Sequence, residues 1–319
     1  MSDFIWTEIF GCPEIGIPAI KSFAFHHPEL YVHVFGFDED LEKLADLPQV
    51  IAMPLDKGSI GRFLYFFSRI TKGKSAINSD IIRRGFRRGH LGTAMLWEFI
   101  IRNIDSERFI HFDSDVIFLD RCIEDVSEAV KLGGLAGPIR NYINNPHGRN
   151  DLRNMEDLCQ TYFFGFDGKY IKRHIGVALQ AHCQGKFLFD RRPVLDFFDP
   201  VMMQMIINGA KPIFLNQDFY GGCNSHGLRN NKYSKFNDFN TPNKIDVGEK
   251  LIHFSAVGSG YNIYKNGSSN VSSAYAQYAL DRFALYYYTV YGKHIGIDVS
   301  AYDELIQFLI DKGIKKFVR

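Results

Sequence analysis

Two aspartates interrupt an apolar run near the middle of the chain and constrain how this region can fold. The segment from Arg108 to Asp120 reads Arg-Phe-Ile-His-Phe-Asp-Ser-Asp-Val-Ile-Phe-Leu-Asp, so Asp113 and Asp115 stand between two apolar stretches. Phe109–Phe112 has the character of a short buried strand. Burying a carboxylate is costly unless a partner compensates its charge. A divalent cation such as Mg²⁺ or Mn²⁺ is an effective partner, because hard cations prefer carboxylate oxygens.

The Asp-Ser-Asp tripeptide by itself is weak evidence for a metal site, because Asp-x-Asp is common where a strand turns into solvent. In that interpretation Asp113 or Ser114 caps the following turn. The position of the acids favours the metal interpretation, because ligands of α/β proteins bind at the carboxyl ends of the strands.

Strand-like and helix-like segments alternate at the start of the chain. Apolar runs at 4–10, 31–37 and 50–55 predict strands, and apolar spacing predicts helices at about 13–27 and 41–47. This alternation predicts a parallel, Rossmann-like sheet with right-handed crossovers. No Gly-x-Gly-x-x-Gly follows the first strand, which argues against the usual dinucleotide-binding site.

The segment from Arg87 to Asp115 resembles the core of the GT-A glycosyltransferases. A helix with small residues near its start, predicted at 88–103, leads into a hydrophobic strand and then into Asp-x-Asp. The resemblance implies an α/β fold of the GT-A type: a Rossmann-like, mostly parallel sheet flanked by helices, with a C-terminal helical extension. The expected divisions are a catalytic domain at 1–265, with a nucleotide-binding half at 1–120 and an acceptor half at 121–265, and the helical extension at 266–319.

The resemblance also implies a metal site and a catalytic acid. Asp113 and Asp115 would hold Mn²⁺ or Mg²⁺ on the diphosphate of a nucleotide sugar, and His253, at the end of a late strand, would complete the ligand set. A buried structural histidine is the alternative for His253. Asp218, in a strand predicted at 213–220, matches the acid between donor and acceptor, which either takes the acceptor proton or binds the sugar. An aspartate that caps the next helix is the alternative for Asp218.

Four further residues are expected to contact the donor. Asp38 follows the second predicted strand, where the family has an acid near the base or ribose, although a solvated acidic turn fits the pattern equally well. His90 starts the helix before the Asp-Ser-Asp strand, where it either contacts a phosphate or caps the helix. Gly185 lies in a segment that resembles the strand along the donor sugar, and Gly258 lies in a glycine-rich turn whose amides can bind phosphate.

Composition argues against several other classes of protein. The formal net charge of +1 gives no electrostatic reason to expect nucleic acid as a partner. Five widely spaced cysteines without Cys-x-x-Cys indicate neither a zinc knuckle nor a disulfide framework, and reduced thiols fit a cytoplasmic protein. We recognise no signal peptide, and no apolar run reaches the ~20 residues of a membrane helix. Leu305, Phe308 and Leu309 predict a final amphipathic helix before a basic end, so association with a membrane surface is an open alternative.

These features predict a metal-dependent glycosyltransferase. It would move a sugar from a nucleotide-diphosphate sugar, with UDP-sugar as the expected donor, to a glycan, lipid-linked or protein acceptor. A nucleotidyltransferase that makes sugar nucleotides shares the fold and the metal chemistry, but the Gly-rich basic signature of that class does not follow the first strand. A sugar-binding module without activity on the same fold is the second alternative.

Overall fold

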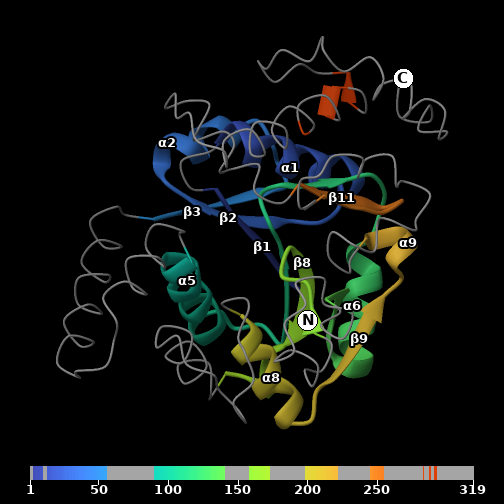
Figure 1. The fold of residues 1–319 in the computed structure, drawn as a ribbon. Helices are drawn as coiled ribbons and strands as arrows, with labels where there is room; N and C mark the ends of the chain where they lie inside the picture. Colours follow the sequence, from blue (N-terminus) through green and yellow to red (C-terminus); the bar gives the residue numbers. More distant parts are fainter. Residues whose placement is uncertain are drawn as a thin grey trace, which may run out of the picture.

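The computed structural model shows an α/β protein with a central mixed sheet and helices on both of its faces (Figure 1). The structure describes residues 3–9, 13–55, 90–140, 158–172, 198–221, 245–254, 283, 287, 288, 291 and 292.

The amino-terminal part forms three parallel strands joined by helical crossovers. The elements are β1 (Phe4–Ile9), α1 (Pro13–His26), β2 (Val32–Gly36), α2 (Asp38–Leu41), a 3-10 turn (Glu42–Leu44) and β3 (Val50–Pro54). Both β1 and β3 pair in parallel with β2. Pro13 opens α1, where a missing N–H costs nothing, and Ile15, Ala19 and Phe23 form a buried face at helical spacing. The predicted alternation of strands and helices is confirmed.

A fourth parallel strand carries the chain to the two aspartates. This strand, β4 (Arg108–Phe112), pairs with β1 so that His111 lies opposite Trp6. Helix α5 (His90–Asn103) precedes β4, as predicted for residues 88–103. The strand order β3-β2-β1-β4 places the carboxyl ends of four parallel strands at one edge of the sheet.

The second half of the sheet is mixed. Its elements are α6 (Ile123–Gly133), β6 (Gly134–Arg140), β7 (Leu158–Cys159), β8 (Phe163–Asp167), α8 (Asp199–Ile207) and β9 (Lys211–Leu215). Strand β8 lies antiparallel between β4 and β6, whereas β9 runs parallel to β6. The sequence pattern predicted neither β8 nor α6. The α/β class with a mostly parallel sheet flanked by helices is confirmed.

A smaller antiparallel sheet lies beside the large one. It consists of β10 (Ile245–Val247), β11 (Leu251–Phe254) and β5 (Val116–Phe118), in the order β10-β11-β5. The late strand expected before His253 is therefore present as β11. Its partner β5 is the apolar stretch that follows the two aspartates.

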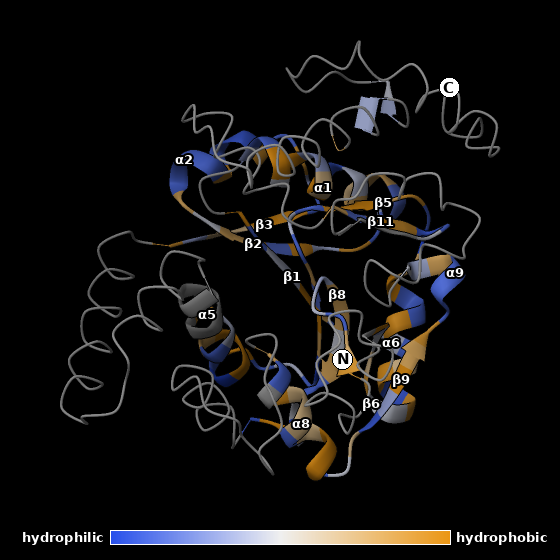
Figure 2. Cartoon of the chain, viewed as in Figure 1, coloured by the Kyte–Doolittle hydropathy of each residue, from blue (hydrophilic) through white to orange (hydrophobic). Residues whose placement is uncertain are grey.

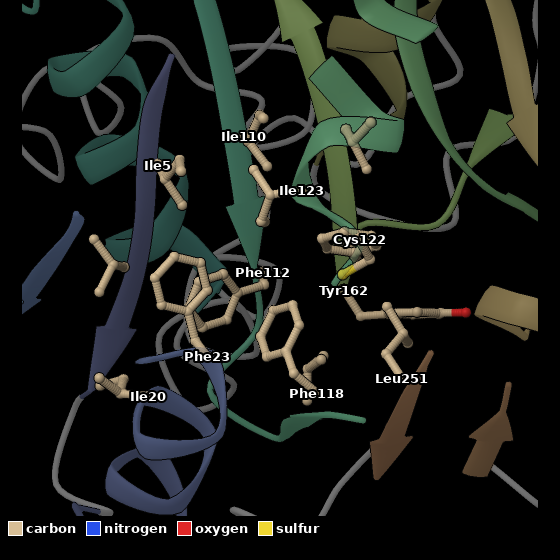
Figure 3. Packing of buried hydrophobic residues seen from close by; sticks show 14 of the residues in the cluster. Ile5, Ile20, Phe23, Ile110, Phe112, Phe118, Cys122, Ile123, Tyr162 and Leu251 are labelled. Carbon is tan, nitrogen blue, oxygen red and sulfur yellow. The ribbon is translucent and has the colours of Figure 1, made fainter. Parts of the chain in front are cut away.

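Successive residues of β4 face two different hydrophobic clusters, because strand side chains alternate between faces. Phe109 packs in a cluster with residues of α5 and α8, whereas Ile110 and Phe112 pack in a cluster with residues of α1 and α6. Figure 2 shows hydrophobic residues along the central strands and a hydrophilic α2. Figure 3 shows part of the second cluster, including Ile5, Ile20, Phe23, Ile110, Phe112, Phe118, Cys122, Ile123, Tyr162 and Leu251.

Two aromatic residues after position 266, Phe283 and Tyr291, contact the small sheet. Phe283 is buried and meets Phe254 edge-on, with 5.3 Å between the ring centroids. The hydroxyl of Tyr291 donates a hydrogen bond to the carbonyl oxygen of Phe118. The boundaries proposed at 1–265 and 266–319 remain a prediction.

Two expectations from composition, on membrane-spanning helices and on cysteines, can be compared with the described residues. None of the helices in these ranges is both long and apolar enough to cross a bilayer. Cys122 is a free thiol, and the side chains of Cys122 and Cys159 are both buried. Burial raises the pKa of the Cys122 thiol well above its usual value.

Candidate active site

Backbone hydrogen bonds hold the turn after β4 from two sides. The Asp113 N–H donates to the Tyr162 carbonyl oxygen at 2.8 Å, and the Val116 N–H donates to the Asp113 carbonyl oxygen at 3.2 Å. On the other side, the Phe254 N–H donates to the Asp115 carbonyl oxygen at 3.0 Å. The turn is thus attached to the segment entering β8 and to β11. Both acids consequently lie at the carboxyl edge of the parallel strands, where ligands bind in α/β sheets.

Strand β11 brings His253 to this turn. Antiparallel pairing with β5 places His253 opposite Val116. The imidazole stacks on Tyr162, with 4.1 Å between ring centroids and an interplanar angle of 16°. Its Nε2 atom lies 3.5 Å from Asp115 Oδ1. One ligand atom from each of Asp113, Asp115 and His253 can be chosen so that all three lie within 4.8 Å of one another.

The chemistry of this metal group, Asp113, Asp115 and His253, fits a divalent cation. Two carboxylates supply hard oxygen donors, and the imidazole nitrogen is a ligand that Mn²⁺ accepts more readily than Mg²⁺ does. Ligand atoms at about 2.1 Å from a common ion are at most about 4.2 Å apart, so small side-chain rotations are sufficient. The three residues come from two segments far apart in the sequence, which a single local turn would not bring together.

Crowding of the acids shapes the electrostatics of the metal group. Burial raises the pKa of Asp113, His111 opposes this shift, and Asp115 adds to it, so the pKa of the Asp113 carboxyl lies above its usual range. The Asp113 side chain remains 40% exposed, so solvent weakens the effect of burial. A bound cation would remove the repulsion between the two carboxylates, because an opposite charge favours their ionised forms.

A buried polar network lies directly behind the metal group. His111 Nε2 donates to Glu8 Oε2 at 2.7 Å, and His111 Nδ1 lies 3.1 Å from the carbonyl oxygen of Thr161. Trp97 Nε1 donates to the other oxygen of Glu8. Both imidazole nitrogens face acceptors, which is the pattern of a doubly protonated ring. Burial alone would lower the pKa of His111, but the Glu8 carboxylate outweighs it and the pKa is raised.

The network reaches the metal group through His111, whose Nδ1 atom lies 3.8 Å from Asp113 Oδ1. The sequence analysis did not identify Glu8 or His111. A signal was present, because each is a polar residue inside an apolar strand. In the β1–β4 register Trp6 lies opposite His111, and Glu8 shares the face of Trp6 because strand side chains alternate.

Of the four other residues predicted to contact the donor, the structure describes the positions of two. Asp38 is the first residue of α2, two residues after the last residue of β2, and its side chain is exposed. His90 is the first residue of α5. Gly185 and Gly258 lie outside the described residues.

The structure corrects the strand predicted at 213–220. Strand β9 ends at Leu215, and Asp218 lies in the short helix α9 (Gln217–Tyr220). Asn216 ends the strand because its side chain caps the helix, accepting a hydrogen bond from the Asp218 N–H at 2.9 Å. Asp218 is therefore not the capping residue, and its side chain is exposed.

The backbone of Asp218 contacts the turn between β10 and β11, before the strand that carries His253. The Glu249 N–H donates to the Asp218 carbonyl oxygen at 2.8 Å, and His253 follows four residues later in the chain. Of the predicted site residues that the structure describes, Asp113, Asp115 and His253 form one group and Asp218 does not join it. A role for Asp218 toward the acceptor stays a prediction.

Comparison with known proteins gives distant structural similarity. No protein-family model matches the sequence, and no curated protein sequence matches it. The structure of the galactosyltransferase LgtC with donor and acceptor sugar analogues matches with a TM-score of 0.43 and 15% identity, over 68% of this chain and 74% of that one.

Two further solved structures show a similar level of resemblance. The apo form of the glycosyltransferase GlyE from Streptococcus pneumoniae matches with a TM-score of 0.44 and 11% identity, over 98% of this chain and 64% of that one. The 4-diphosphocytidyl-2C-methyl-D-erythritol synthase from Anaerococcus prevotii matches with a TM-score of 0.37 and 10% identity, over 67% of this chain and 86% of that one.

Proposed function

We propose that this protein is a metal-dependent glycosyltransferase of the GT-A type. It transfers a sugar from a nucleotide-diphosphate sugar, preferentially a UDP-sugar, to a hydroxyl group of a glycan, lipid-linked or protein acceptor. The observation that supports this proposal is the meeting of Asp113, Asp115 and His253 at the carboxyl edge of the parallel strands. That edge is where an α/β sheet binds a nucleotide.

The residues of the metal group have distinct tasks in this proposal. Asp113 and Asp115 hold Mn²⁺ or Mg²⁺ against the diphosphate of the donor, and His253 completes the protein ligands. The bound ion supplies Lewis-acid stabilisation of the negative charge on the departing diphosphate. Tyr162 fixes the orientation of His253, because the two rings stack.

The remaining predicted residues contact the two substrates, the donor and the acceptor. Asp38 binds the base or ribose from the carboxyl end of β2, the neighbouring strand to β1. His90, Gly185 and Gly258 contact the phosphates and the sugar of the donor. Asp218 either binds the acceptor or acts as the general base that takes the proton of the acceptor hydroxyl.

Thermal unfolding with a panel of nucleotides and nucleotide sugars, with and without Mn²⁺, tests this proposal. A ligand at about 100 times its Kd adds about 2.7 kcal/mol to the free energy of unfolding. We expect a metal-dependent rise in Tm with one nucleotide sugar in the wild type. Asp115→Asn should lose this rise, and Asp120→Asn should keep it, because Asp120 is an exposed acid outside the metal group.

The products then distinguish the reaction class. A transferase should release free sugar and nucleoside diphosphate slowly from the donor in the presence of Mn²⁺. Pyrophosphate release from a nucleoside triphosphate and a sugar phosphate would instead identify a nucleotidyltransferase. Binding without turnover in both assays would identify a sugar-binding module, and no Tm shift with any nucleotide would refute the donor site.

A further inference from the structure

A second cluster of possible metal ligands lies at the opposite edge of the sheet, at the start of β2. His27 follows the last residue of α1 and is completely buried. Its ring packs edge-on against Phe118, with 5.8 Å between the ring centroids. Packing of this kind fixes the plane of the imidazole and therefore the direction in which each ring nitrogen points.

One nitrogen of this buried ring lacks a hydrogen-bond partner. His27 Nδ1 is buried and unsatisfied. The atom that it faces is Glu124 Oε2, 3.9 Å away, which is too far for a hydrogen bond. An unpaired buried nitrogen next to a carboxylate oxygen costs free energy unless something lies between them. A metal ion about 2.0–2.1 Å from each atom would bridge this gap with little movement.

The other nitrogen has a suitable outer partner. His27 Nε2 lies 3.9 Å from the thiol sulfur of Cys122, within range of a hydrogen bond to sulfur. A histidine that ligates a metal donates its second N–H to a neighbouring acceptor, which fixes the tautomer. With the proton on Nε2, the lone pair of Nδ1 points toward Glu124.

Glu29 adds a third ligand to the cluster. One ligand atom each from His27, Glu29 and Glu124 can be chosen so that all lie within 4.8 Å of one another. Arg121 donates hydrogen bonds to Oε1 of both glutamates and holds the two carboxylates together. Glu124 Oε2 remains directed at His27. Both glutamates also line a cavity of about 540 Å³, which gives an ion access from solvent.

We propose that His27, Glu29 and Glu124 form a structural site for Zn²⁺ or a similar transition-metal ion. Imidazole and carboxylate ligands suit Zn²⁺, whereas Mg²⁺ binds imidazole poorly. The side chains of Glu29 and Glu124 are half exposed, so they can make the small rotations that bring the ligand atoms closer together. The ion would clamp the segment between α1 and β2 to the first turn of α6. This site is separate from the metal group and does not rest on the proposed transferase activity.

Titration with Zn²⁺ alone, after treatment with a chelator, tests the site. The measurements use the full chain carrying Asp115→Asn, so that the metal group at the other edge is impaired in every sample. Calorimetry gives the affinity and stoichiometry, and the visible absorption of Co²⁺ in place of Zn²⁺ reports a nitrogen and oxygen ligand field. The variants are Glu124→Gln, His27→Gln and the matched control Glu128→Gln, which changes an exposed acid on the same helix.

We expect Glu124→Gln to weaken Zn²⁺ binding at least tenfold and to reduce the rise in Tm on adding Zn²⁺, with Glu128→Gln unchanged. His27→Gln should lose the nitrogen contribution to the Co²⁺ spectrum. Equal Zn²⁺ affinity in the Glu124→Gln and Glu128→Gln proteins would overturn the proposal. Glu124 is half exposed, so the Glu124→Gln variant should fold. The comparison with Glu128→Gln is therefore decisive even if the variant at the buried His27 fails to fold.

Discussion

His253 Nε2 lies 3.5 Å from Asp115 Oδ1, joining β11 to the turn after β4. The backbone repeats this connection, because the Phe254 N–H bonds to the Asp115 carbonyl oxygen. The imidazole and the carboxylate are therefore held in place by a strand pairing and not only by their own contact. Preorganised ligands of this kind bind a cation without first having to order a loop.

Replacing His253 by glutamine should weaken Mn²⁺ binding at least about tenfold, because one of three protein ligands is lost. Titration followed by the electron paramagnetic resonance of free Mn²⁺ measures this affinity. His33→Gln is the control, since His33 is a half-buried histidine on β2 whose Nδ1 faces the Ile5 carbonyl oxygen. Unchanged affinity in His253→Gln would show that this histidine is structural, which is the alternative raised by its burial.

Breaking the pair between Glu8 and His111 should destabilise the protein strongly. Removing one partner of a buried ion pair costs about 3–5 kcal/mol, because the other charge stays buried. Denaturant unfolding of Glu8→Gln, His111→Gln and the double variant gives the coupling energy. We expect the free energy of unfolding of the double variant to fall by much less than the sum of the decreases in the two single variants. Additive losses would show that the two side chains do not interact as described.

Stability should fall as pH falls from about 6.5 to about 4 because of His27. Burial lowers the pKa of His27 to about 4, so the unfolded chain takes up this proton at a higher pH than the folded protein does. The neutral buried ring contributes its full stability above the unfolded pKa. In chelator-treated protein this loss amounts to about 2 kcal/mol between pH 7 and about pH 5.

Denaturant unfolding at these two pH values checks the prediction, with His27→Gln as the protein that lacks the titrating group. The wild type should lose more stability than the variant does. Equal losses in the two proteins would assign the pH dependence to other groups.

Adding a methyl group at Gly165 on β8 should push α6 away from the sheet. A Cβ atom there would lie 2.7 Å from Val126 Cγ1, 2.9 Å from Val130 Cγ2 and 3.2 Å from the Phe109 carbonyl oxygen. Overpacking of this size costs about 1–3 kcal/mol. Denaturant unfolding should show this loss in Gly165→Ala and partial recovery after adding Val126→Ala. If Val126→Ala only adds a further loss, the predicted clash with that side chain is wrong.

The parallel half of the sheet could be predicted from the sequence, because that half depends on local patterns. Apolar runs, helical spacing and Pro13 at the start of α1 are written in neighbouring residues, and these elements agree with the observed bounds to within a few residues. Asp113 and Asp115 also stood out in the sequence as candidate metal ligands, because two acids between apolar stretches are unusual without a compensating charge. His253 was singled out through a family resemblance. Only the three-dimensional structure shows that it lies beside the two aspartates.

The rest of the fold and of the site depends on pairing between distant segments, which the sequence pattern does not reveal. Antiparallel β8 inserts between β4 and β6, and β5 pairs with β11, although no local pattern specifies either partner. The end of β9 at Leu215 was missed because the cap made by Asn216 competes with strand pairing over a few residues. The contacts of Glu8 with His111 and of His27 with Glu124 arise because the fold brings a buried histidine next to a carboxylate from a distant segment. Such contacts form only when packing excludes water, and apolar periodicity alone does not encode which buried polar groups will meet.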